Sequence, residues 1–147
     1  MYSLGNVLKL FISKRDFEKR VKKESIKIDN NGVLEDKFYN KDIDRSLLIV
    51  STDTYKMIYD NDIRLEYGDL GENILTDFNP YSLKIGTKIK VGETILEISK
   101  VPPVCRHLVK FDKRLPKLII NDRGIFAKVI KGGEVRLNDK FHYHSSS

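Results

Sequence analysis

The residue with the most distinctive chemistry in this chain is Cys105, the only cysteine among 147 residues. It follows Pro102 and Pro103, which restrict the backbone, and it directly precedes Arg106 and His107. Positive charge beside a thiol favours the thiolate, which is the form that attacks sulfur or binds a metal. A lone cysteine can also be a small buried hydrophobic residue. The residues alone leave both interpretations open.

The net charge of +6 arises from one part of the sequence. Residues 105–131 contain 8 basic and 2 acidic side chains, whereas residues 1–100 contain 17 of each. A basic segment that begins at the cysteine would attract an anionic ligand. The alternative is a solvated basic face that binds nothing. The single cysteine excludes an intramolecular disulfide and a zinc site built from several thiolates.

Histidine offers weaker candidates for chemistry. A catalytic pair of Cys105 with His107 is conceivable, although side chains so close in sequence rarely point at each other usefully. His142 and His144 fall in a C-terminal segment that ends in three serines, where we expect disorder rather than a metal site. The glycines match neither a phosphate loop nor a dinucleotide-binding fingerprint.

Glu72 is the most notable acidic residue, because it follows Gly71 and precedes Asn73. The sequence alone favours a turn residue that hydrogen-bonds its own backbone. The 14 Phe and Tyr residues do not interleave with the basic segment. Their distribution argues against a surface for single-stranded nucleic acid.

Short strands separated by turn residues dominate the predicted secondary structure. The segment Asp29-Asn-Asn-Gly32 is a strong turn signal, and Gly92-Glu93 joins two apolar segments with alternating residues. Gly132-Gly133 is predicted to be the turn of a last hairpin. The predicted strands span residues 5–13, 25–28, 33–35, 45–51, 88–91, 94–99, 126–130 and 134–137. Together they predict a mostly β barrel with a few short helices.

A helix is predicted after the strand that ends near residue 51. A polar residue among 51–53 can cap it, and Tyr55, Ile58 and Tyr59 then form one apolar stripe. A second, short helix is predicted over residues 105–111. The apolar runs are too short to cross a membrane, and the first residues contain no secretion signal. We therefore expect a cytoplasmic protein.

Several segments, taken in order, resemble a MOSC domain, the molybdenum cofactor sulfurase C-terminal domain. They are Gly5-Asn-Val7, Arg45-Ser-Leu-Leu-Ile, Gly71-Glu-Asn-Ile74, Leu83-Lys-Ile-Gly86, Val91-Gly92 with Leu96-Glu-Ile98, Pro103-Val-Cys-Arg-His-Leu108, Gly124-Ile-Phe-Ala127-Lys-Val129 and Gly133-Glu-Val135. The resemblance implies a single MOSC domain over residues 1–141 with a β-barrel fold. Residues 142–147 are then expected to be a disordered tail.

The resemblance implies that Cys105 carries sulfur as a persulfide or ligates the molybdenum of a molybdopterin cofactor. In the sulfurases, a desulfurase domain with pyridoxal phosphate supplies the sulfur. The sequence matches neither that domain nor its lysine motif, so pyridoxal phosphate is not expected on this chain. Arginines would pair with the phosphate of the pterin. The expected cofactor-binding residues are Arg45, Glu72, Asn73, Arg106 and Arg123.

Three functional hypotheses follow. In the first, the protein handles sulfur or the molybdenum cofactor through Cys105, and its partner is a cysteine desulfurase or a molybdenum enzyme. In the second, it is a non-catalytic basic barrel that binds an acidic protein, or less expectedly nucleic acid, through residues such as Lys113 and Arg114. In the third, it is an accessory subunit that only docks onto a molybdenum enzyme. No membrane partner is expected.

Overall fold

The computed structural model describes residues 2–103 and 105–145, and seven strands of this part of the chain form a closed barrel. The order around the barrel is β11-β7-β8-β9-β5-β6-β1, and β1 pairs back with β11. These strands are β1 (Gly5–Ile12), β5 (Leu47–Ser51), β6 (Ile74–Thr76), β7 (Lys88–Val91), β8 (Thr94–Lys100), β9 (Ile125–Lys131) and β11 (Lys140–Tyr143). The predicted mostly β barrel with a few short helices is confirmed.

A small second sheet lies beside the barrel and corrects one prediction. Its order is β10 (Gly133–Arg136), β3 (Ser25–Asp29) and β4 (Gly32–Val33). The expected hairpin around Gly132-Gly133 is wrong, because β10 pairs with β3 and not with β9. A Cβ atom on Gly132 would lie 2.5 Å from the carbonyl oxygen of Ile28. The glycine is therefore needed for close backbone approach to β3 rather than for a turn.

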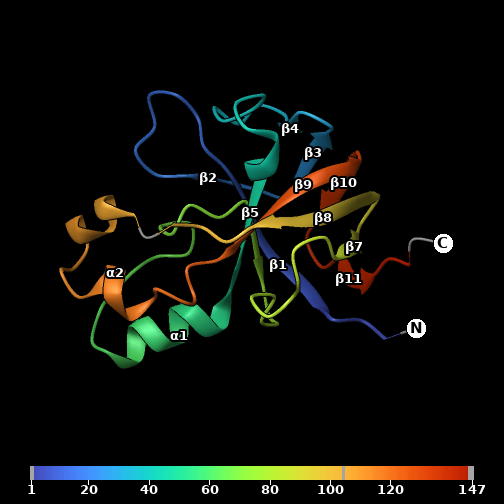
Figure 1. The fold of residues 1–147 in the computed structure, drawn as a ribbon. Coiled ribbons are helices and arrows are strands. Elements are labelled where there is room, and N and C mark those ends of the chain that lie inside the picture. Colours follow the sequence, from blue (N-terminus) through green and yellow to red (C-terminus); the bar gives the residue numbers. More distant parts are fainter. Residues whose placement is uncertain (1, 104, 146–147) are drawn as a thin grey trace.

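The fold contains two apolar cores, which share β5. Leu47 and Ile49 point into the barrel, whereas Leu48 and Val50 face the helices outside it. This double burial explains why β5 is a continuous apolar run in the sequence. Figure 1 shows helices α1 (Thr52–Asp60) and α2 (Leu115–Leu118) on one side of the barrel and both termini on the other.

Helix α1 begins where the sequence predicted. Ser51 is its N-cap and accepts a hydrogen bond of 3.0 Å from the backbone N–H of Asp53. Tyr55 and Ile58 are buried, but Tyr59 is 60% exposed, so the predicted stripe is narrower than expected. None of the helices in the described residues is long and apolar enough to cross a membrane.

Three short elements complete the fold. After β8, the 3-10 helix η2 (Arg106–Lys110) forms where a helix was predicted over residues 105–111. A second 3-10 helix, η1 (Ile43–Arg45), precedes β5, and the strand β2 (Val21–Lys23) pairs with β1 and extends the barrel sheet. At the C-terminal end, His142 and Tyr143 pair with β7, which corrects the expected start of the tail at residue 142. The last two residues of that expected tail lie outside the described part.

Candidate functional site

A cleft of about 920 Å³ lies between the loop after β1, the segment before β5 and the segment after β8. Its volume is in the range of cavities that bind small molecules. Four acidic side chains contribute to its lining, against seven cationic ones: Lys19, Arg20, Lys37, Lys41, Arg45, Lys110 and Arg123. Only Lys110 and Arg123 come from the basic segment that the sequence singled out. Most of the positive charge of the cleft comes from residues 19–45.

Cys105 lines this cleft and is half-buried. Its Sγ lies 2.6 Å from Nδ1 of His107, so the expectation that these two side chains do not meet is wrong. Cys105 has an extended backbone and is the N-cap of the 3-10 helix that begins at Arg106. The Cys105 side chain makes no capping hydrogen bond to this turn. Histidine, rather than a helix end, is therefore the nearest polar partner of the thiol.

His107 can act as a base at this position. Burial, followed by the positive charges of Arg123 and Lys110, lowers the pKa of His107 below its usual 6.5. The imidazole is therefore neutral at pH 7, and a neutral ring has one nitrogen that accepts a proton. When Nδ1 is that nitrogen, the thiol of Cys105 can donate its proton to His107.

Two arginines of the cleft have a buried Nε donor that makes no hydrogen bond within the described residues. Arg123 donates from Nη1 to the carbonyl oxygen of Leu70 at 2.5 Å and interacts electrostatically with Cys105. Arg45 stacks over the ring of Phe126 at 5.4 Å. The Nε atoms of both arginines are buried and have no hydrogen-bond partner among the described residues, although the Nε of Arg45 lies 3.7 Å from the Asp42 carboxylate. Both guanidinium groups line the cleft, where their charge would attract an anionic ligand.

Comparison with known proteins identifies the fold. No protein-family model and no curated protein matches the sequence. The YuaD protein from Bacillus subtilis matches with a TM-score of 0.80 over 97% of both chains, at 17% identity. YuaD and YiiM proteins are members of the MOSC-domain family. The fold is a MOSC-like β-barrel.

Two YiiM structures match this MOSC-like barrel as well. YiiM from Geobacillus stearothermophilus has a TM-score of 0.77 at 13% identity and covers 96% of this chain and 75% of its own. YiiM from Escherichia coli has a TM-score of 0.67 at 18% identity, with coverage of 100% and 71%. At these identities the likeness concerns the fold.

Glu72 lies beneath the cleft of the MOSC-like barrel and does not line it. Its carboxylate is fully buried and accepts hydrogen bonds from the Tyr55 hydroxyl at 2.7 and 2.9 Å and from the backbone N–H of Gly68 at 3.0 Å. The same loop supplies the Leu70 carbonyl that holds Arg123. Glu72 therefore supports the loop that positions an arginine, rather than contacting a ligand.

The protonation of Glu72 gives a testable pH dependence. Burial raises the pKa of Glu72 above its usual 4.5, despite the hydrogen bonds from Tyr55 and Gly68. Stability is therefore lost as the pH rises from 4.5 through the raised pKa, because the folded protein resists losing this proton. In Glu72→Gln this dependence is absent. We expect the unfolding free energy of the wild type, relative to Glu72→Gln, to fall in urea titrations as the pH rises above about 4.5. A constant difference would contradict this assignment.

Asn73 lines the cleft, but both polar atoms of its side chain form hydrogen bonds within the protein. Its Oδ1 accepts from the N–H of Leu48 at 3.1 Å, and its Nδ2 donates to the carbonyl of Phe11 and to Asp36 Oδ2. Asp36 is buried and also lies 3.5 Å from Nη1 of Arg20. Sequence reasoning missed Asp36 and Arg20, since neither belongs to a recognisable motif and only folding brings them together.

Three further expectations concern Arg106, the basic segment and a metal site. Arg106 is exposed and does not line the cleft, so the fold does not place it with Arg45 and Arg123. Nor do the cations of residues 105–131 form one free face, since Arg114 binds Asp112 and Lys128 lies 3.3 Å from Glu97. Among the described residues, no three His, Cys, Asp or Glu side chains cluster as a metal site would require.

Proposed function

We propose that this protein handles sulfur or the molybdenum cofactor as a MOSC-type protein, with Cys105 as its reactive group. The observation that carries the proposal is that the Cys105 thiol opens on the cationic cleft, 2.6 Å from His107 Nδ1. The cytoplasm is the proposed compartment, because a lone thiol stays reduced there. A cysteine desulfurase or a molybdenum enzyme is the proposed partner.

The residues of the cleft support transfer of sulfane sulfur. His107 takes the proton of Cys105, and the positive charge of Arg123 stabilises the resulting thiolate. The thiolate attacks the outer sulfur of a persulfide on the donor enzyme. A new S–S bond forms on Cys105, the S–S bond of the donor breaks, and the donor cysteine leaves as a thiolate. No external oxidant or reductant is needed.

The donor set of the cleft also fits a molybdopterin group. The guanidinium groups of Arg45 and Arg123 line the cleft and suit its phosphate, and Cys105 is a soft ligand for its metal. When bound, the molybdenum cofactor supplies two-electron redox chemistry. The protein would contribute phosphate binding through these arginines and a thiolate through Cys105, whose proton His107 accepts.

Arg123→Gln tests the cleft against Arg106→Gln, a matched control that removes the same charge outside the cleft. Protein purified from cells that make molybdopterin is oxidised, and the fluorescent pterin product is measured per chain. We expect Arg106→Gln to retain as much pterin per chain as the wild type. Arg123→Gln should retain less, because losing one charge-assisted phosphate contact weakens the affinity for the pterin about tenfold. Equal retention in both variants would contradict the role of Arg123. A wild type that holds no pterin would remove the cofactor from the proposal and leave sulfur transfer.

A further inference from the structure

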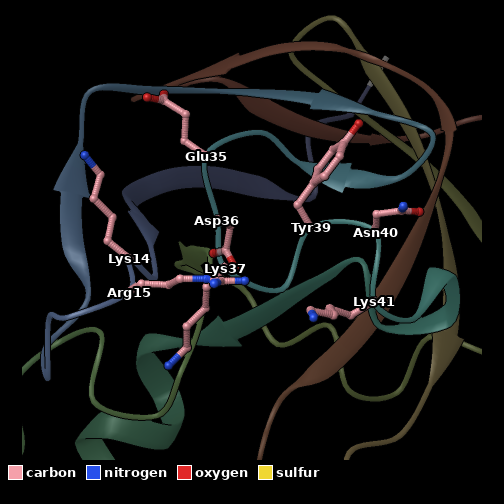
Figure 2. Close-up of a pocket in the computed structure, with 8 residues that line it drawn as sticks. All are labelled: Lys14, Arg15, Glu35, Asp36, Lys37, Tyr39, Asn40 and Lys41. Carbon is pink, nitrogen blue, oxygen red and sulfur yellow. The ribbon is translucent and has the colours of Figure 1, made fainter.

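A second hollow, which we call the basin, lies beside the cleft and has a different composition. Its volume is about 680 Å³, and Figure 2 shows the side chains that line it: Lys14, Arg15, Glu35, Asp36, Lys37, Tyr39, Asn40 and Lys41. Aliphatic side chains are missing from this lining. The basin shares Asp36, Lys37 and Lys41 with the cleft, whereas Lys14 and Arg15 line only the basin.

The two loops that carry the basin are tied together. Ser13 donates its backbone N–H to Asp36 Oδ2 at 2.9 Å and accepts from the N–H of Lys37 at 2.7 Å. Tyr39 donates its hydroxyl to Asp29 at 2.6 Å, and the N–H of Asn40 donates to the carbonyl of Asn31 at 2.8 Å. The cations of the basin are therefore attached to a backbone that is held in place.

The positive charge of the basin is not neutralised within the described residues. Lys14, Arg15, Lys37 and Lys41 have no ion-pair partner there. The Asp36 carboxylate is buried and already faces Arg20. Glu35 is then the only acidic side chain left to oppose four cations. Like charges gathered around one hollow produce a positive potential that attracts an anion.

We propose that the basin binds a diphosphate group, in a site that does not depend on Cys105. Four cations against Glu35 leave three positive charges, and a diphosphate carries about three negative charges near neutral pH. Lysine and arginine are the usual side-chain donors to phosphate. The charged side chains of the lining suit a small anionic ligand. Inorganic diphosphate and a nucleoside diphosphate share this group, so both serve as probes of the basin.

Calorimetric titration with two probes, inorganic diphosphate and ADP, tests this site. The basin variant is Lys14→Ala with Arg15→Ala. The control is Lys84→Ala with Lys90→Ala, which removes the same charge from exposed positions outside both hollows. We expect saturable binding of at least one probe by the wild type. The basin variant should bind about tenfold more weakly or worse, and the control should change by less than about twofold.

Several results would overturn the proposal. Wild-type protein that binds neither probe saturably would do so, as would equal weakening in the basin variant and its control. Lys110→Ala, which alters only the cleft, must leave binding unchanged, since a loss there would place the diphosphate in the cleft. Tighter binding of ADP would identify the ligand as a nucleoside diphosphate, and equal binding would assign the basin to the diphosphate group alone. Thermal unfolding of each variant verifies that it is folded.

Discussion

Cys105→Ser is expected to abolish persulfide formation on this chain when the protein is incubated with a cysteine desulfurase and its substrate. Cys105 is the only thiol in the sequence, and serine cannot carry sulfane sulfur. The expected loss is complete, and intact-protein mass spectrometry before and after incubation measures it. The unfolding free energy should change little, because the side chain is only half-buried and makes no capping hydrogen bond.

His107→Ala is expected to slow sulfur uptake by Cys105 without abolishing it. The thiol remains, but the nitrogen 2.6 Å from Sγ that can accept its proton is removed. Loss of a general base slows a reaction by about 10²-fold or more, so we expect slow rather than absent sulfur uptake near neutral pH. Uptake should recover at high pH, where solvent alone deprotonates the thiol. A wild type that gains no sulfur and retains no pterin would contradict the proposed function.

Phe141→Ala is expected to destabilise the protein by about 3–5 kcal/mol, the usual cost of truncating a buried phenylalanine. Phe141 is fully buried in β11 and lies at the seam where β1 and β11 close the barrel. Its ring also contacts that of Phe78 edge-on, with centroids 5.2 Å apart. Denaturant unfolding of the variant and the wild type measures the difference.

Tyr143→Ala is the matched control for this substitution. Tyr143 lies two residues later in the same strand but is 57% exposed, so we expect a change within about 1 kcal/mol. Similar losses in both variants would mean that β11 is weak as a whole, and that the cost at Phe141 does not come from the barrel interior. A small loss at Phe141 would contradict closure of the barrel by β11.

Local signals in the sequence predicted most of the secondary structure correctly. The turn at residues 29–32, the hairpin at Gly92 and the Ser51 cap each depend on residues only a few positions apart. Strand β5 was found because both of its faces are apolar. Such features follow from backbone conformational preferences and from the alternation of side chains along a strand.

Strand pairings between distant segments could not be predicted from such local signals. Gly132-Gly133 has the composition of a turn, yet its small size serves close approach to β3, about a hundred residues earlier. The strand at Lys140–Tyr143 has a weak local signal beside a polar tail, and its partners are β1 and β7. A short sequence window contains no information about which strand edge is free to accept such a segment.

The candidate site was likewise only partly predictable from the sequence. The sequence by itself determined that Cys105 is the only thiol and that prolines and cations flank it, and the resemblance to the MOSC domain implied Arg45 and Arg123 as candidates for anion binding. Only the tertiary structure decided that His107 meets the thiol and that Arg106 points elsewhere. It also decided that the charge of the cleft comes mainly from residues 19–45, which are distant in sequence from the cysteine. The physical reason is that charge acts through space, so its effect depends on how a closed barrel brings separate loops together.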